Sequence, residues 1–144
     1  WKEIEWIRDI WPGKLIIKGI LDVDDAQTAT KTGASAIVVS NHGGRQLDGG
    51  ASAISLLPKI AAAVGDRIEI MFDGGVRSGQ DVMRTLALGA KSCLLGRAYI
   101  FGVGAGGQAG VATAIDIIRH ELEISMAFTG VKRVEDIGRN VLVH

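Results

Sequence analysis

The sequence has a single cysteine and no excess of either charge. Cys93 is the only cysteine among 144 residues, so no disulfide can form within the chain, which is typical of a reducing compartment such as the cytoplasm. The 16 basic and 16 acidic side chains give a formal net charge of zero. This balance excludes the electrostatic pattern of a nucleic-acid-binding protein and of a polybasic membrane-surface protein. We expect no nucleic-acid partner and no metal site.

The first residues lack both an initiating methionine and a secretory signal. They carry apolar side chains at helical spacing: Ile4, Trp6, Ile7, Ile10 and Trp11. The spacing predicts an N-terminal helix within residues 1–12. A sequence that opens inside a helix indicates a fragment, a processed product or a partly observed chain.

Long hydrophobic runs are also scarce, with one exception. Residues 98–115 contain no charged side chain, and this length just reaches that of a membrane span. Glycines recur throughout the run, so we expect a strand exit, a loop and the start of a helix instead. Gly102, Gly104 and Gly107 match a G-x-G-x-x-G dinucleotide pattern. The acidic residues about twenty positions later, Glu121 and Glu123, fall in a helical pattern instead of at a strand end, which argues against a nucleotide site.

Four short apolar runs alternate with helical patterns along the rest of the chain. The runs are nearly continuous, which is typical of parallel strands covered on both faces; they are Lys14–Ile17, Ala36–Val39, Ile68–Phe72 and Ser92–Leu95. The helical patterns cover Asp24–Thr32, Ser52–Val64, Ser78–Leu88 and Gly110–Phe128, and the third begins with a Ser78–Asp81 capping pattern.

This alternation predicts an α/β fold of βαβ units with a parallel sheet and right-handed crossovers. Four such units amount to half of an eightfold barrel, which takes about 250 residues. An open doubly wound sheet is the alternative. Candidate functional residues follow every strand, rather than gathering at one switch point, and this favours the barrel. We predict one half-barrel domain over residues 1–144, ending in a C-terminal tail over residues 129–144.

The most informative motif, Ser40–Asp48, follows the second strand directly. His42 is a candidate general base and Arg45 a fixed cation, a pair suited to removing a proton from a small carboxylic acid that the cation holds. The alternative is a loop histidine that caps or packs locally. Asp48 suits a structural role, either pairing with Arg45 or capping the next helix. No carboxylate in the chain is evidently placed to orient the imidazole.

The other strand ends carry further charge. Lys18 closes the first strand, where it could stabilise a developing anion or simply extend into solvent. The third strand ends at Asp73–Arg77 and the fourth at Gly96-Arg97. Glycines that expose backbone N–H groups, together with two arginines, make a candidate phosphate cradle. Two tight turns with solvated arginines are the alternative.

Together these motifs resemble the FMN-dependent 2-hydroxy-acid dehydrogenases and oxidases, a family that includes glycolate oxidase, lactate dehydrogenase and oxidase, and mandelate dehydrogenase. The motifs are Ile17-Lys18-Gly19, Ser40–Asp48, Asp73–Arg77 and Gly96-Arg97, and the resemblance covers nearly the whole chain. It implies that the four strands are strands five to eight of a (β/α)8 TIM barrel.

The resemblance also implies roles for individual residues. His42 would be the active-site base in contact with substrate, and Arg45 would hold the substrate carboxylate. Lys18 would stabilise the reduced, anionic flavin beside its pyrimidine ring, and Ser40 would contact the flavin. Asp73 would bind the ribityl chain. The remaining cofactor-binding residues, which would surround the phosphate, are Gly74, Gly75, Arg77, Gly96 and Arg97.

The implied reaction is FMN-dependent oxidation of a small L-2-hydroxy acid (lactate, glycolate or mandelate type) to the 2-oxo acid. Electrons would then pass to oxygen, a quinone or a cytochrome, in the cytoplasm or at the cytoplasmic face of a membrane in the full-length protein. The family's first four strands are missing, and with them the substrate-site tyrosines, a second arginine and the aspartate that orients the histidine. We therefore expect the isolated chain to be inactive and to need the N-terminal half-barrel or a second copy, most simply within a homo-oligomer.

Two alternatives stay open. The chain could be a non-catalytic half-barrel that binds FMN or phosphate and self-associates. Another phosphate-binding barrel would explain the two phosphate turns but would leave His42 and Arg45 without a role.

Overall fold

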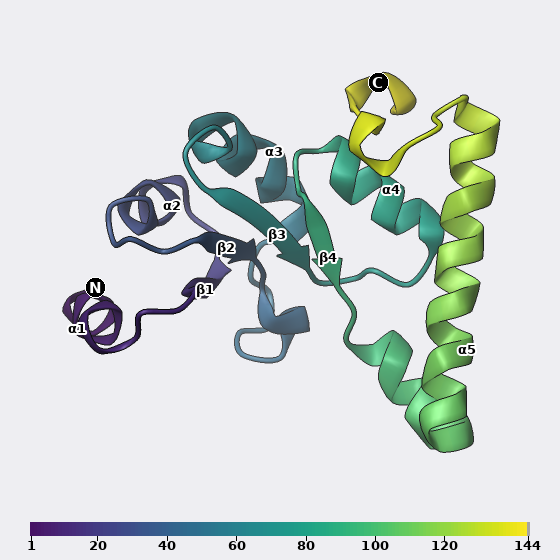
Figure 1. Cartoon of the computed structure of the whole chain (residues 1–144), viewed down its shortest axis with the longest axis horizontal. Coiled ribbons are helices and arrows are strands. Elements are labelled where there is room, and N and C mark those ends of the chain that lie inside the picture. Colours follow the sequence, from purple (N-terminus) through teal and green to yellow (C-terminus); the bar gives the residue numbers. More distant parts are fainter. Residues whose placement is uncertain (144) are drawn as a thin grey trace.

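Four parallel strands form one sheet, and their order in space follows their order in the chain. The computed structural model describes residues 1–143 (Figure 1). The strands are β1 (Ile16–Ile20), β2 (Ala36–Val39), β3 (Glu69–Asp73) and β4 (Ser92–Leu94), in the sheet order β1-β2-β3-β4. All three pairings are parallel. The predicted α/β class is therefore confirmed, and the strand order does not reverse at a switch point as it does in a doubly wound sheet.

Helices connect the strands and extend the chain at both ends. They are α1 (Lys2–Ile10), α2 (Val23–Ala29), α3 (Ala53–Val64), α4 (Gly79–Ala87) and α5 (Arg97–Thr129), with short 3-10 turns η1 (His42–Gly44), η2 (Val134–Asp136) and η3 (Arg139–Val141). Figure 1 shows α2, α3 and α4 along one side of the sheet. This arrangement is consistent with part of a TIM barrel.

The core lies between the sheet and these helices. Ile37 and Phe72 from the sheet and Leu57 and Ile60 from α3 are almost completely buried there. Successive strand residues alternate between faces, so Ile16 and Leu94 point to the other face of the sheet, where both are exposed. The sheet therefore has one face covered by helices and one face that the described residues leave partly open.

The first strand begins and ends later than its apolar run suggested. Lys18 lies inside β1, opposite Val38, and pairing continues to Ile20 across a shift in register. Gly19 adopts a φ of 98°, which a glycine reaches without strain, and this permits the bulge. The prediction that Lys18 ends the strand was therefore wrong by two residues.

Residues 97–115 are mostly helical where a strand exit, a loop and a helix start were predicted, and the helix is interrupted at Gly106 and Gly107. Helix α5 begins at Arg97, and only Gly106 and Gly107 within it have non-helical backbone angles. A Cβ on Gly110 would lie 2.0 Å from the carbonyl oxygen of Gly102, so the chain folds back on itself at this kink. By length and composition alone α5 could cross a membrane, which is weak support for a span. The fold-back gives a physical argument against one straight span, and the G-x-G-x-x-G pattern lies within the helix instead of at a strand-to-helix turn.

Helix α4 begins at the predicted capping box and packs against α5. Ser78 Oγ accepts a hydrogen bond from the Asp81 N–H at 3.2 Å, and Asp81 Oδ2 accepts one from the Ser78 N–H at 3.1 Å. Gly79 is buried, and a Cβ there would lie 2.0 Å from the backbone nitrogen of Leu122. The C-terminal tail then returns to this helix pair, where Ile137 packs with Met83.

Because no side chain fits at position 79, we expect Gly79→Ala to lower the free energy of unfolding by about 2–3 kcal/mol, the cost of a backbone overlap that only a helix shift relieves. Gly104→Ala is the matched control. A Cβ there meets nothing within 4 Å, so the unfolding free energy should stay equal or rise. Urea unfolding midpoints of both variants would check this, and equal midpoints would contradict the close packing.

Burial raises the pKa of the Cys93 thiol to about 11, and a hydrogen bond with Thr85 only partly opposes the shift. At pH 8 the folded chain should therefore hold about 100-fold less thiolate than an unperturbed cysteine and should alkylate correspondingly slowly. The unfolded thiol ionises first, so stability should fall as the pH rises from 9.0 towards 11. Iodoacetamide labelling with and without urea measures the difference, and equal rates would show that the thiol is not buried.

Candidate active site

A cleft of about 450 Å³ opens at the carboxyl ends of the strands. Every residue predicted for the site except Ser40 lines it, from the Lys18 strand to the Arg97 helix start. This volume lies within the range of small-molecule and cofactor sites. The carboxyl ends of strands that are far apart in the sequence thus lie around one cleft.

Beneath this cleft, side chains from three neighbouring strands form one polar network. Lys18 Nζ lies 2.7 Å from Asp73 Oδ2 and 3.0 Å from Ser40 Oγ. The Ser40 hydroxyl donates a hydrogen bond to Asp73 Oδ1 and accepts one from the His42 backbone N–H at 3.0 Å. A hydroxyl has one donor and two acceptor positions, so Ser40 is fully used. Ser40 is completely buried and supports the cleft from below.

The His42 side chain is exposed to the cleft and stands on a constrained turn. Its φ of 54° is in the left-handed region, which non-glycine residues rarely adopt. A Cβ on Gly19 would lie 2.7 Å from His42 Nε2, so glycine at position 19 leaves room for the ring. Among residues 1–143, no carboxylate forms an ion pair with this imidazole, in agreement with the sequence analysis.

Arg45 lies on the same loop, is exposed and lines the cleft. The prediction that Asp48 pairs with Arg45 or caps the next helix was wrong. Ser52 occupies the N-cap position of α3, and Asp48 Oδ1 accepts the Gly49 N–H at 3.1 Å. The reason is local: the chain turns at Gly49, whose φ is 76°, and the carboxylate closes that turn.

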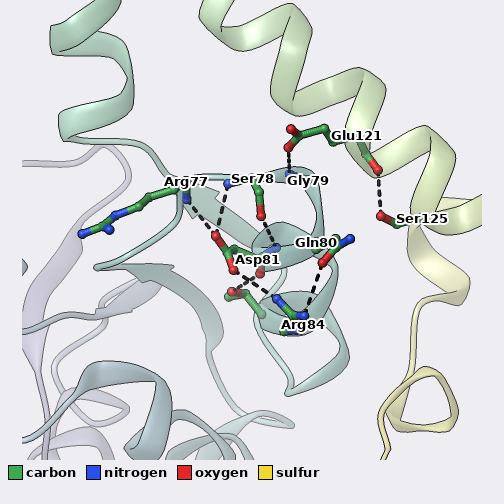
Figure 2. Close-up of polar contacts among 9 residues, drawn as sticks. Arg77, Ser78, Gly79, Gln80, Asp81, Arg84, Glu121 and Ser125 are labelled. Atoms are coloured by element: carbon green, nitrogen blue, oxygen red, sulfur yellow. Dashed lines mark hydrogen bonds and ion pairs between the residues drawn. The ribbon is translucent and has the colours of Figure 1, made fainter.

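The other end of the cleft combines glycine turns with two guanidinium groups. Gly74 and Gly75 have φ values of 108° and 84°, and a Cβ on Gly75 or Gly96 would meet nothing within 4 Å. The Arg77 backbone N–H donates to Asp81 Oδ2 at 3.1 Å, while its side chain extends away from α4 (Figure 2). Arg97 begins α5, and its Nη2 lies 3.5 Å from the Gly43 carbonyl oxygen.

Two polar lining residues were missed by the sequence analysis, Gln46 and Tyr99. Gln46 directly follows the predicted arginine. Tyr99 is the only tyrosine, but the expected loop after Arg97 hid the fact that a helix begins there and brings Tyr99 to the cleft. Its position two residues after the Gly96-Arg97 motif was the available signal.

The charges of the lining residues define what the cleft can bind. Four cations line it (Lys18, Arg45, Arg77 and Arg97) against one carboxylate, Asp73, which leaves a surplus of three positive charges. Arg45 and a potential base stand on the loop after β2. Arg77 and Arg97 stand beside the glycine turns after β3 and β4, and Arg97 also reaches the Gly43 carbonyl oxygen of the first loop. The cleft therefore suits one or more anionic ligands.

Known proteins match the chain over its whole length. The model of the FMN-dependent dehydrogenase family matches residues 1–144. An L-lactate dehydrogenase of Caulobacter sp. (strain K31) is 55% identical over 142 residues, which cover 99% of this chain and 37% of that protein. An L-lactate dehydrogenase of Actinobacillus pleuropneumoniae serotype 5b (strain L20) is 51% identical over 143 residues, covering 99% and 38%.

Solved structures agree with this match. A crystal structure of mandelate oxidase with benzoyl-formic acid superposes with a TM-score of 0.93 at 42% identity, covering 96% of this chain and 42% of that one. The chain thus spans well under half the length of the relatives it matches. On the match over residues 1–144 and these identities, the chain belongs to the FMN-dependent dehydrogenase family.

Proposed function

We propose that this chain supplies the C-terminal half, strands five to eight, of a (β/α)8 enzyme that uses FMN to oxidise a small L-2-hydroxy acid to the 2-oxo acid. The observation that carries this proposal is the meeting of Lys18, His42, Arg45, Arg77 and Arg97 around one cleft. Relatives named L-lactate dehydrogenase and mandelate oxidase support the substrate class.

The donor set of the cleft fits FMN. The phosphate would lie against Arg77, Arg97 and the glycine backbone of the two turns. A Cβ on Gly75 or Gly96 would meet nothing within 4 Å, whereas one on Gly74 would lie 3.2 Å from Asn41 Oδ1. Asp73 would accept hydrogen bonds from ribityl hydroxyls, and Lys18 would lie beside the pyrimidine ring, with Ser40 fixing both from below. FMN, when bound, supplies the acceptor for the two electrons that leave the substrate.

The chemistry of the chain's own residues follows from their placement. The planar guanidinium of Arg45 would bind the substrate carboxylate through two parallel hydrogen bonds and so present the 2-hydroxyl carbon to His42. The imidazole of His42, which lies against Gly19, would accept the proton. The Lys18 ammonium, held by Asp73 and Ser40, would favour negative charge that develops nearby.

The remaining strands would come from elsewhere. Strands β1 and β4 have one neighbour each within residues 1–143, and Ile16 and Leu94 lie exposed on the sheet face away from the helices. Unpaired strand edges and an open apolar face favour further pairing. We propose that the N-terminal half-barrel, or a second copy in a homo-oligomer, closes the barrel and supplies the groups that orient His42.

A non-catalytic FMN-binding half-barrel is the second candidate. One observation favours it: the proposed phosphate-binding groups all lie within this chain, whereas the imidazole has no carboxylate partner among the described residues. Such a module would bind FMN and self-associate without turnover.

Anaerobic spectra of FMN separate the two candidates. We expect the chain alone to bind FMN, but L-lactate, glycolate or mandelate should not bleach the flavin, because the other half of the pocket is missing. Co-expression with the first four strands of an L-lactate dehydrogenase relative should restore bleaching. Bleaching by the chain alone would contradict the need for an N-terminal half-barrel, and no bleaching in either preparation would favour the binding module.

In that assembled barrel, His42→Ala should slow flavin reduction by about 1,000-fold while FMN stays bound, because the proton has no acceptor. His120→Ala is the matched control, since His120 lies exposed on α5 beside Glu123 and should leave the rate unchanged. Stopped-flow absorbance of the flavin measures both. Reduction of the His42 variant at the parent rate would show that another group is the base.

A further inference from the structure

One carboxylate from α5 reaches the start of α4. Glu121 Oε2 accepts a hydrogen bond from the Gly79 backbone N–H at 2.8 Å, across 42 residues of sequence (Figure 2). The side chain of Glu121 is partly buried, and the Ser125 hydroxyl donates to its backbone carbonyl oxygen at 2.7 Å. This contact joins α5 to the start of α4, two residues after Arg77, which lines the cleft.

The first turn of a helix has N–H groups without partners inside the helix. At α4 the capping box satisfies three nearby donors: Asp81 Oδ2 accepts the N–H groups of Arg77 and Ser78, and Ser78 Oγ accepts that of Asp81. The N–H groups of Gly79 and Gln80 remain in this turn, and Glu121 supplies the acceptor for that of Gly79. A carboxylate is also favourable at this end of the helix dipole.

Steric fit reinforces the hydrogen bond. Gly79 lies so close to α5 that a Cβ would stand 2.4 Å from the backbone carbon of Glu121 and 2.6 Å from the carbonyl oxygen of Ile118. The start of α4 is therefore fixed against α5 by both packing and a charged acceptor.

Arg77 precedes Gly79 by two residues. Arg97 begins the first part of α5, and Glu121 lies in the second part, beyond the kink at Gly106 and Gly107. We propose that Glu121 is a positioning residue, which holds the backbone at Arg77 so that its guanidinium and that of Arg97 face one phosphate group. This inference rests on the proposed function of the cleft. Without the contact, only the capping box would hold the backbone at Arg77, and ligand binding would have to restrict its remaining freedom at a cost in affinity.

A phosphate-specific measurement tests this role. Dissociation constants for FMN and for riboflavin, which lacks the phosphate, would be measured by flavin fluorescence with the full 144-residue chain. Glu121→Ala should weaken FMN binding by roughly 3- to 10-fold, the effect of one lost hydrogen bond, and should leave riboflavin binding unchanged.

Two variants serve as controls. Glu121→Gln removes the same charge but keeps an oxygen that can accept the Gly79 N–H, so it should bind FMN as the parent does. Glu123→Ala removes an exposed carboxylate on the same helix and should have no effect. Residue-resolved hydrogen exchange should show a faster Gly79 amide in Glu121→Ala only, and this readout needs no ligand.

The outcomes are distinct. A parent chain that binds FMN no more tightly than riboflavin would overturn the proposed phosphate site. In the second case the parent chain binds FMN more tightly than riboflavin, while Glu121→Ala either keeps the same preference or loses affinity for both ligands equally. Either result would overturn the positioning role alone. Unchanged exchange at Gly79 would overturn the contact itself.

Discussion

The Ser40 hydroxyl is the constraint on which the cleft depends. It binds the Asp73 carboxylate, the Lys18 ammonium and the His42 backbone at once, and it is completely buried. A buried network is stable only when each member has its partners, so the three strand ends cannot shift independently. The positions of the cation, the carboxylate and the imidazole loop are therefore set by one hydroxyl.

The other end of the cleft is held in a different way. Arg77 and Arg97 stand before or at the first turns of α4 and α5, and these helices meet through Gly79 and Glu121. The pairing of β3 with β4 brings the two guanidinium groups to the same edge of the sheet, and the contact between α4 and the second part of α5 fixes the turn after Arg77. A ligand with a phosphate group and a reactive ring would contact both these helix starts and the polar network around Ser40.

Much of the fold follows from local patterns. Nearly continuous apolar runs marked all four strands, and the Ser78–Asp81 box marked the start of α4. The wrong predictions of element bounds fall at glycines, where the backbone adopts conformations that the apolar pattern does not indicate. Gly19 carries β1 past Lys18, and the glycine-rich run after Arg97 is a kinked helix because Gly102 and Gly110 allow its two parts to touch. Sequence periodicity cannot detect either effect, since both arise from contacts between backbone segments.

By itself the sequence determined the α/β class, the chemical types of the candidate site residues and the resemblance to the FMN-dependent family, since these depend on residue identity and short-range order. Only the tertiary structure decided that Ser40 lies beneath the cleft, that Asp48 closes its own turn, that Tyr99 reaches the mouth and that Glu121 holds Gly79. Those facts depend on distances between residues far apart in the chain. Packing and hydrogen-bond geometry set these distances, and a short sequence pattern contains no information about them.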